Sequence, residues 1–461
     1  MENYTKITPE IRAEIIAALD KGSVVTDPER LVDYNKDASE LRFVPEMVVT
    51  PKTTQEVAAL VCLANKHHFP LTPRGGGSGL AGACLAQFGG VVLSLEGMNQ
   101  IRTIDTRNFI MEVEAGAISL DVREAAAEKG LFYPPDPAGM DKSTIGGNAA
   151  TDAGGPACVK YGTTRDYILG LEAVLPTGEI ITTGVKTRKG VVGYDLTNLL
   201  VGAEGTLGII TALTLKLIPK VSATTCIMAV FHDMVTAMEA VSTVMANGHL
   251  PSAIEFMDHR CLDLVGEMLP VALPPGKPSV LIIEIDGNKG RIQEEIQDIA
   301  GRCTAMGAFH IIPAPHDAER EKIWEVRRQV SLRIHDYAPL YVSEDVAVPL
   351  SAIADLVNRL PGFEKQYKLE IFAFGHAGDG NIHLNVTAQN RDIIPLVNQG
   401  IRALLQLVLD LGGTISGEHG IGIAKKEFIA MELSATSLAL QKGMKRLFDP
   451  NNILNPGKIF S

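Results

Sequence analysis

Helical and strand-like periods of apolar residues alternate along the whole chain. A first helix is predicted from Thr8, the expected N-cap, with Pro9 at its first position and Gly22 after its last turn. Apolar residues three and four positions apart predict further helices over residues 54–65, 119–129, 235–246, 317–335 and 392–411, and an amphipathic helix before the closing DPNNILNPGKIF. Apolar or alternating runs predict strands over residues 91–95, 110–114, 168–175, 180–183 and 280–285, and a strand pair over 370–386.

This mixture of elements predicts an α+β fold with more than one domain. The first block of elements ends near Pro219, and a second block follows it. We therefore expect one domain over residues 1–221 and a second over 222–425, with residues 426–461 packing back on the first. Because no repeat or low-complexity linker separates the blocks, we expect the domains to pack against each other.

Charge and apolar content exclude several classes of protein. The 461 residues include 42 Lys and Arg against 54 Asp and Glu, a formal net charge of −12, without a basic run. Such a chain is a poor binder of nucleic acid or of an anionic membrane. The best candidate for a membrane span, residues 199–218, contains Glu204 and Lys216 and predicts buried strands instead, so no transmembrane segment is expected. The N-terminus lacks a signal-peptide pattern.

The cysteines indicate a reducing compartment. Six cysteines lie at least 22 residues apart, so the chain has no CxxC pair. This spacing excludes an iron–sulfur protein, a zinc ribbon and a disulfide scaffold. Reduced thiols in a cytoplasmic enzyme fit best.

The first glycine-rich segment is PRGGGSGLAG, residues 73–82. Gly77, Gly79 and Gly82 match GxGxxG, but a dinucleotide fingerprint must close a strand and open a helix. Only residues 83–88 separate this loop from Gly89-Gly90 and the next strand, which is too short for that helix, so a Rossmann fold is excluded. The loop can still bind phosphate through its backbone N–H groups, although a glycine run by itself is equally typical of a mobile surface loop.

A second small-residue segment favours the binding interpretation. It runs from PPDP at residues 134–137 into STIGGNAATDAGG at residues 143–155. Two such loops in one domain predict a bulky planar ligand with a diphosphate, approached closely by the backbone.

A candidate metal site lies in FGHAGDGNIHLN, residues 374–385. Asp379-Gly380 predicts a two-residue hairpin turn, with Asp379 as a turn residue. This turn would pair His376 with His383 on one side of the strands, where two imidazoles can bind one cation. Glu418, between glycines in SGEHG, is the candidate third ligand for Zn, Mn or Fe. The alternative is an exposed histidine pair and an ordinary loop acid.

The motifs in order resemble a known superfamily over residues 40–461. PRGGGSGLAG, IGGNAATDAGG, KYGTTRDY and LLVGAEGTLGII resemble the FAD-binding domain of the vanillyl-alcohol-oxidase (PCMH-type) flavoproteins. FGHAGDGNIHLNV, GEHGIG and ILNPGKIF resemble its D-2-hydroxyacid dehydrogenase branch, which includes D-lactate dehydrogenases, the flavin subunit of glycolate oxidase and D-2-hydroxyglutarate dehydrogenase. The resemblance implies a two-subdomain PCMH-type FAD-binding domain and an α+β substrate (cap) domain with an antiparallel sheet.

The resemblance also implies where FAD binds. Members with covalent flavin often carry a histidine in the first loop, where this chain has glycine and serine, so we expect noncovalent FAD. The residues expected to contact it are Arg74, Gly75, Gly76, Gly77, Ser78, Gly79, Leu80 and Gly82 at the diphosphate; Pro135, Asp136, Pro137, Thr144, Gly146, Gly147, Asn148, Thr151, Gly154 and Gly155 along the ADP half and the isoalloxazine; Ile209 and Ile210 beside the adenosine; and Tyr161, Gly162 and Asn455 from the remaining motifs.

In this family the two histidines and the glutamate bind a divalent metal, so the resemblance favours His376, His383 and Glu418 as ligands. It implies that His419 is the base that removes the hydroxyl proton. Arg327 is the expected partner of the substrate carboxylate, and Asn385, two residues beyond His383, is a further candidate for holding substrate.

The expected activity is FAD- and metal-dependent oxidation of a small D-2-hydroxy acid, D-lactate or glycolate, to the 2-oxo acid. A D-2-hydroxyglutarate enzyme and a flavin electron-transfer subunit without a substrate site are the alternatives. The resemblance implies that D-2-hydroxyglutarate dehydrogenases hold the second carboxylate of their substrate with a lysine at the position of Ser343. The serine of this chain supplies no such charge, which favours monocarboxylate substrates. Electrons would pass to an electron-transferring flavoprotein, an iron–sulfur subunit or a quinone. The sequence leaves homo- or hetero-oligomers open, as well as peripheral attachment to a membrane through a partner.

Overall fold

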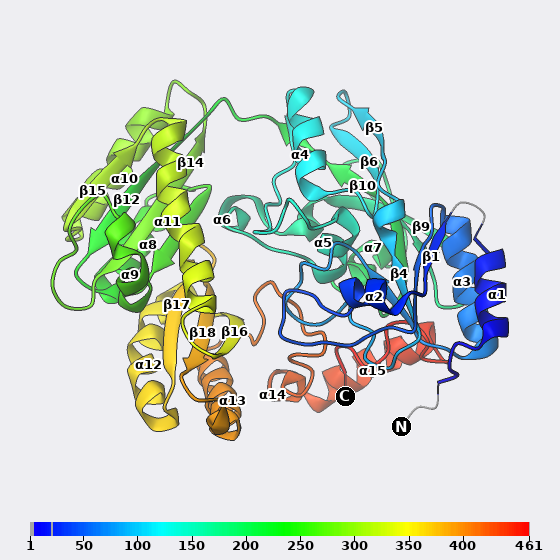
Figure 1. Ribbon diagram of the computed structural model, residues 1–461. Coiled ribbons are helices and arrows are strands. Elements are labelled where there is room, and N and C mark those ends of the chain that lie inside the picture. The colour runs from blue at the N-terminus through cyan, green and yellow to red at the C-terminus, as the bar shows by residue number, and fades with distance from the viewer. Residues whose placement is uncertain (1–3, 20–21, 461) are drawn as a thin grey trace. The chain divides into compact units, whose positions relative to one another are not determined.

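The computed structural model of the chain describes residues 4–19 and 22–460 (Figure 1). The chain folds into two compact units. The first contains the described residues of Met1–Gly154, Thr163–Lys220 and His419–Ser461, and the second contains Gly155–Gly162 and Val221–Glu418. The two units divide between Lys220 and Val221, whereas the predicted domain boundary lies after residue 221. The C-terminal return begins at His419 rather than at residue 426, and residues 155–162 belong to the second unit.

The second unit includes residues 155–162 because this segment is bonded to its sheet. Helix α6 (Cys158–Tyr161) contacts strand β13 (Ala253–Met257). The Nζ of Lys160 forms an ion pair with Asp286, and the hydroxyl of Tyr161 donates to Oδ2 of the same carboxylate at 2.7 Å. No local pattern in the sequence signals this long-range attachment.

The first sheet of the first unit is mixed. Its order is β1 (Ser23–Val25), β2 (Met47–Thr50), β4 (Val91–Ser94) and β3 (Leu71–Arg74), with β2 and β3 parallel to β4 and β1 antiparallel to β2. Strands β2 and β4 are buried throughout, as continuous apolar runs predict. Helix α3 (Thr54–His67) precedes β3 and begins at the N-cap Thr53.

The first helix is shorter than predicted. Helix α1 (Pro9–Ala17) begins as expected, because the side chain of Thr8 accepts a hydrogen bond from the N–H of Ile11. The prediction that Gly22 ends this helix is wrong, since its C-cap is Ala18. Residues 20 and 21, which the prediction also covered, lie outside the described residues.

The second sheet of the first unit is antiparallel. Its order is β5 (Ile101–Asp105), β6 (Ile110–Glu114), β10 (Ile209–Lys216), β8 (Ile168–Val174) and β9 (Ile180–Gly184). The pairing of β8 with β9 confirms the predicted hairpin. Helices α4 (Ser119–Glu128), α5 (Ile145–Thr151) and α7 (Leu196–Leu200) belong to the same unit, and α5 contacts β10 (Figure 1). Strands β7 (Leu131–Phe132) and β11 (Ile218–Pro219) form a separate pair.

The C-terminal segment returns to the first unit. It contains α14 (Ile429–Glu432) and α15 (Ala435–Phe448), followed by a bridge between Leu71 of β3 and Leu454. The N–H of Asn455 donates to the carbonyl of Leu71 at 2.8 Å. Leu454 and Asn455 therefore lie beside the strand that leads into the first glycine-rich loop.

The second unit is built on one seven-stranded antiparallel sheet. Its order is β15 (His310–Ala314), β12 (Ala223–Phe231), β14 (Ser279–Gly287), β13, β17 (Glu370–His376), β18 (Asn381–Ala388) and β16 (Leu340–Ala347). Helices α9 (His259–Val265) and α11 (Asp317–His335) pack together on one face. A second group of helices contact one another: α8 (Met234–Ala246) packs against α10 (Ile292–Ala305) and α12 (Ile353–Tyr367), and α12 packs against α13 (Ile394–Asp410).

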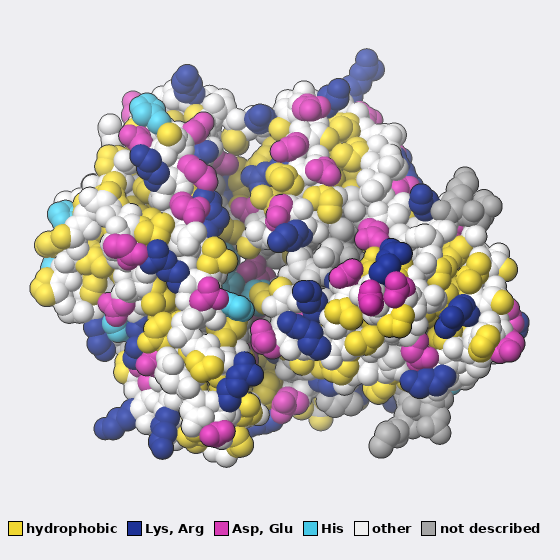
Figure 2. Space-filling model, viewed as in Figure 1, with side chains coloured by type: hydrophobic (Ala, Val, Ile, Leu, Met, Phe, Trp, Pro, Cys, Tyr) yellow, Lys and Arg dark blue, Asp and Glu magenta, His cyan; other side chains and the backbone are white. Residues whose placement is uncertain are grey.

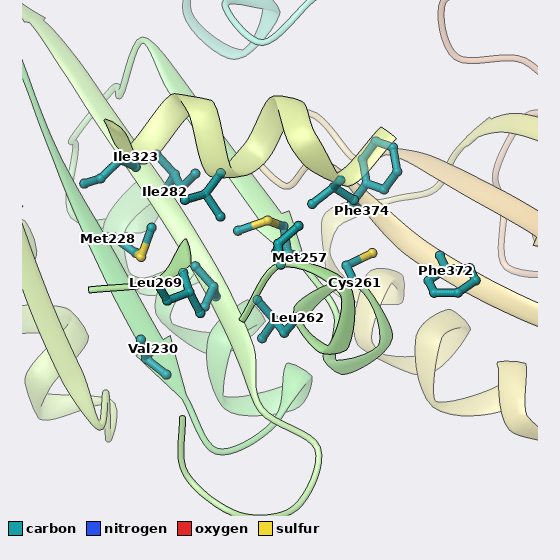
Figure 3. Packing of buried hydrophobic residues seen from close by; sticks show 14 of the residues in the cluster. Met228, Val230, Met257, Cys261, Leu262, Leu269, Ile282, Ile323, Phe372 and Phe374 are labelled. Atoms are coloured by element: carbon teal, nitrogen blue, oxygen red, sulfur yellow. The ribbon is translucent and has the colours of Figure 1, made fainter. Parts of the chain in front are cut away.

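The core between this sheet and helices α9 and α11 supports the candidate site. Alternate residues of the strands, among them Met228, Ile282 and Phe374, bury their side chains here against Leu262 of α9 and Ile323 of α11 (Figure 3). Each fully buried side chain of this size contributes roughly 1.5–3 kcal/mol. Since Phe374 lies two residues before His376, the packing of this core fixes the strand that carries the histidine.

The surface carries charges of both signs. Acidic and basic side chains are interspersed over the face in view in Figure 2.

One helix is long and apolar. Within the described residues, one helical stretch, Arg391–Asp410, has the length and composition to cross a membrane, which the sequence analysis did not identify. One face of α13, including Ile401 and Leu405, is buried and α13 contacts α12 and β16, whereas Ile394 is 42% exposed.

Candidate functional site

The first glycine-rich loop presents a row of unpaired backbone donors. Within the described part of the chain, no N–H group from Gly75 to Leu80 has a hydrogen-bond acceptor. The N–H of Gly82 closes the loop by donating to Oδ2 of Asp37 at 2.9 Å. Consecutive free N–H groups form an anion-binding concavity suited to phosphate. The loop thus has the donors that a diphosphate needs.

The two glycine-rich loops pack directly on each other. A Cβ on Gly75 would overlap Oγ1 of Thr144, and one on Gly76 would overlap the carbonyl of Lys142. Thr144 is the N-cap of α5 and accepts from the N–H of Gly147 at 3.2 Å. The close approach therefore requires glycine, and it brings the predicted diphosphate loop against the start of the second segment. This arrangement fits a ligand such as FAD that extends along both loops.

Several other predicted cofactor residues have structural hydrogen bonds. The Nδ2 of Asn148 donates to Oγ of Ser119 at 2.8 Å, and the hydroxyl of Thr151 donates to the carbonyl of Gly147 at 3.2 Å. The Nδ2 of Asn455 donates to the carbonyls of Ala83 and Glu204 at 2.9 and 2.7 Å. These bonds shape the loops, and contact with a cofactor remains a prediction for each residue.

The remaining predicted cofactor residues fall into two groups. Those in the first unit lie in loops, in the first turn of α5 (Gly146) or at the start of β10: Ser78, Gly79, Pro135, Asp136, Pro137, Gly146, Gly154, Ile209 and Ile210. Gly155, Tyr161 and Gly162 belong to the second unit, and the hydroxyl of Tyr161 is bonded to Asp286. Their proposed contact with FAD stays a prediction.

The predicted hairpin exists, but its register differs. The predicted pairing of His376 with His383 is wrong, because His376 lies opposite Asn381 and His383 lies opposite Phe374. The turn contains residues 377–380, and the carbonyl of His376 accepts from the N–H groups of Asp379 and Gly380. A shift of two residues leaves every side chain on its predicted face. The two imidazoles therefore remain neighbours, with ring centroids 5.2 Å apart.

Three side chains of the second unit are arranged like metal ligands. The Oε1 of Glu418 lies 3.5 Å from Nε2 of His376 and 3.6 Å from Nε2 of His383. Two ligands that each lie about 2.1 Å from a tetrahedral metal are about 3.4 Å apart. The Nε2 of His376 is buried and, within the described chain, has no hydrogen-bond partner. Such an orphaned nitrogen is expected of a ligand, so these residues fit a divalent cation.

Glu255 of β13 links this cluster to Arg327, and the sequence analysis missed it. The Nδ1 of His376 donates to Oε1 of Glu255, and Nε of Arg327 donates to Oε2 at 2.8 Å. Glu255 is 1% exposed. A single charged residue in the apolar strand AIEFM was the available signal, because a buried carboxylate needs a partner. A carboxylate on Nδ1 leaves Nε2 as the metal-binding nitrogen.

The carboxylates of this cluster favour the binding of a cation or a proton between them. Burial lowers the pKa of His376, but the Glu255 and Glu418 carboxylates outweigh it and raise that pKa well above its usual value. Burial raises the pKa of Glu255, but His376 and Arg327 together hold it below the usual range. Without a metal the imidazole would therefore bind a proton between the two carboxylates.

Arg327 and Asn385 lie on the same side of the sheet as the histidines. The guanidinium carbon of Arg327 is 4.3 Å from the ring centroid of Phe374. Because Nε is bound to Glu255, the Nη groups are left to bind an anion. The Oδ1 of Asn385 accepts from the hydroxyl of Tyr341 at 2.8 Å, which orients the amide. His419 directly follows Glu418 and is the first residue of the C-terminal segment of the first unit.

Comparisons with known proteins agree along the full chain. Residues 220–459 match the family model described as FAD linked oxidases, C-terminal domain, and residues 45–184 match that described as FAD binding domain. The chain is 37% identical to the glycolate oxidase subunit GlcD of Bacillus subtilis, covering 99% of this chain and 97% of the relative. It is 35% identical to a D-lactate dehydrogenase of Anaerostipes hadrus (99% and 98%) and 30% identical to a D-2-hydroxyglutarate dehydrogenase of Stutzerimonas stutzeri (98% and 99%).

The fold is shared with a solved structure of this superfamily. p-Cresol methylhydroxylase with substrate bound superposes with a TM-score of 0.79 at 18% identity, covering 98% of this chain and 96% of that chain. The chain therefore has the PCMH-type fold, with antiparallel sheets and an FAD-binding domain. It belongs to the FAD-linked oxidases of the vanillyl-alcohol-oxidase (PCMH-type) superfamily, in the group of D-lactate, glycolate and D-2-hydroxyglutarate dehydrogenases.

Proposed function

We propose that the protein is an FAD- and metal-dependent dehydrogenase that oxidises D-lactate or glycolate to the 2-oxo acid, with noncovalent FAD. The observation that carries the proposal is the position of Glu418, whose Oε1 lies 3.5 and 3.6 Å from the two imidazole nitrogens. Two imidazoles and one carboxylate suit Zn, Mn or Fe and leave coordination positions for a substrate. The relatives named as glycolate oxidase subunit and D-lactate dehydrogenase support the substrate class.

Each proposed residue has a stated task. When bound, the flavin supplies a hydride acceptor and the metal a Lewis acid for the hydroxyl and carboxylate. His376, His383 and Glu418 would hold the metal, and the loop from Arg74 to Gly82 would hold the FAD diphosphate. Arg327 would bind the substrate carboxylate through its Nη groups while Glu255 fixes Nε.

Two further residues would complete the reaction. His419 would take the hydroxyl proton as a general base. The Nδ2 of Asn385 would donate to the substrate, since Tyr341 already occupies Oδ1. Electrons would then leave for an electron-transferring flavoprotein, an iron–sulfur subunit or a quinone, because the six cysteines lie at least 22 residues apart and form no cluster-binding motif.

We expect a cytoplasmic enzyme that is free or attached to a membrane through its acceptor, with possible homo- or hetero-oligomers. The mixed surface charge and the net charge of −12 support small-molecule substrates over nucleic acid.

The alternative substrate is D-2-hydroxyglutarate, which one relative at 30% identity is named for. The position of Ser343 disfavours D-2-hydroxyglutarate as the substrate. In the register of β16 and β18, Ser343 lies opposite Asn385, so the side chain at this position shares a face with the proposed substrate residue. A serine supplies no cation for a second carboxylate, and burying an unpaired carboxylate costs several kcal/mol.

Flavin reduction in the absence of oxygen tests these proposals. D-lactate, glycolate and D-2-hydroxyglutarate are mixed in turn with one preparation of the holoenzyme, and the loss of flavin absorbance is followed. We expect a kcat/KM for a monocarboxylate that is orders of magnitude above that for the dicarboxylate. Comparable reduction by D-2-hydroxyglutarate would favour the alternative, and no reduction by any of the three would favour an electron-transfer subunit.

A further inference from the structure

Asp345 of β16 is a fully buried carboxylate beside the proposed metal ligands. Its Oδ2 accepts hydrogen bonds from the N–H groups of Gly417 at 2.9 Å and Glu418 at 2.8 Å, and from the hydroxyl of Ser416 at 3.2 Å. All three donors belong to the loop that carries the third proposed ligand. This one oxygen therefore holds the backbone of that loop at the residue where the ligand is attached.

The other oxygen of Asp345 is also engaged. Its Oδ1 accepts from Nδ2 of Asn381 at 2.6 Å and lies 4.0 Å from Nδ1 of His383, which is too long for a hydrogen bond. A Cβ on Gly417 would overlap Nδ2 of Asn381 and lie 2.9 Å from Oδ1 of Asp345. Glycine at position 417 is what lets the loop come this close to the carboxylate.

These contacts separate two possible roles of Asp345. Its oxygen lies close enough to His383 and Glu418 to be counted with them as a ligand. Three of the four donors to Asp345 bond to Oδ2, and all three come from the Glu418 loop, whereas Oδ1 accepts from Asn381. The pattern is that of an oxyanion that holds a backbone, as in a capped helix N-terminus.

We propose that Asp345 is a positioning residue: by holding the N–H groups of Gly417 and Glu418 it sets the Glu418 carboxylate at similar distances, 3.5 and 3.6 Å, from the two histidines. The inference rests on the proposed function, because it gives Glu418 the role of metal ligand. When a metal ligand lies on a mobile loop, metal binding costs conformational entropy because the loop must become ordered. A loop that is already held in place reduces this entropy cost.

The test is Asp345→Asn, in which an amide N–H₂ can replace the accepting oxygen. Divalent metal is removed from the FAD-containing protein with a chelator, and the affinity for Zn²⁺ and Mn²⁺ is measured by competition with a metal-binding dye. We expect the variant to bind about 10–100-fold more weakly. In the metal-free protein, hydrogen exchange of the amides of Gly417 and Glu418 should become about tenfold faster or more, with FAD content unchanged.

Asp258→Asn is the matched control. Asp258 is also buried and accepts from two backbone N–H groups, of Cys261 at 2.9 Å and Ala373 at 3.2 Å, but no donor belongs to the Glu418 loop. It should leave metal affinity and exchange at residues 417–418 unchanged. If Asp345→Asn does not fold, Gly417→Ala displaces the same loop while the carboxylate stays, and it should weaken metal binding similarly.

The outcomes are distinguishable. Wild-type affinity and exchange in Asp345→Asn would overturn the inference. Weaker metal binding with unchanged amide exchange would also overturn it, because Asp345 would then act as a ligand. If the wild-type protein binds neither of these metals, nor Fe²⁺ in the absence of oxygen, the proposed function fails, whereas the exchange of the two amides still decides whether Asp345 holds the loop.

Discussion

Replacing Glu255 with glutamine should damage both the proposed metal site and the fold of the second unit. Glutamine has nearly the same shape but only one acceptor oxygen. At Glu255 two donors need an acceptor, Nδ1 of His376 and Nε of Arg327. One of them would therefore face the N–H₂ of the new side chain, and the Arg327 charge would lose its buried partner.

The size of the effect follows from burial. Glu255 is 1% exposed and Arg327 is 8% exposed, so water replaces little of the lost interaction. Breaking a buried ion pair by removing one partner costs about 3–5 kcal/mol. For a unit of about 200 residues this lowers the melting temperature by roughly 6–20 °C. Loss of the carboxylate that orients a metal-binding histidine weakens metal affinity by about 10–100-fold.

A second carboxylate of the same sheet supplies the control. Glu284 of β14 accepts from Nε1 of Trp324 at 2.8 Å and lies 3.5 Å from Nε of Arg320, another arginine of α11. It contacts neither histidine and is partly exposed, so Glu284→Gln should cost about 1 kcal/mol or less and leave metal affinity unchanged.

Both variants are compared with wild type by thermal unfolding and by metal competition. Unchanged metal affinity in Glu255→Gln, in a protein that still contains FAD, would refute the role given to Glu255. An equal loss of affinity in Glu284→Gln would show that any weakening of the sheet suffices and would refute the specific link through His376.

Three further predictions follow from the same structure. Acid precipitation should leave FAD in the supernatant because no histidine lies in the first glycine-rich loop, and yellow colour in the pellet would contradict the noncovalent link. His376→Ala should remove the metal and most activity but keep the flavin spectrum, whereas His419→Ala should keep the metal and slow flavin reduction by about 10²–10⁴. Unchanged turnover after chelation would contradict the metal role. Burial lowers the pKa of Lys458 to about 7. Between pH 7 and about 10 the unfolded chain then binds a proton that the folded chain lacks, so stability due to this group rises with pH across that window. Lys458→Met should stabilise the protein most below pH 7, by about 5 kcal/mol at most, and a pH-independent difference in unfolding free energy would contradict the shift.

Local features of the fold could be predicted because they depend on neighbouring residues. Thr8 and Pro9 start the first helix through a side-chain cap and a fixed φ, both of which act within one turn. The period of two in a strand placed His376 and His383 on one face, and this survived an error of two residues in the register. The glycine-rich loops predicted, from the sequence alone, that another group could approach their backbone closely.

The tertiary structure alone decided which distant residues meet. His376 and Glu255 are 121 positions apart, and Asp345 is 73 positions from Glu418. Nothing local selects these pairs, because the order of strands β13, β17, β18 and β16 in the sheet depends on the packing of the whole second unit. The hairpin register was likewise set by the contacts of both strands with β13 and β16 rather than by the Asp379-Gly380 turn. A short turn contributes little energy against a buried sheet, so the longer-range packing prevails.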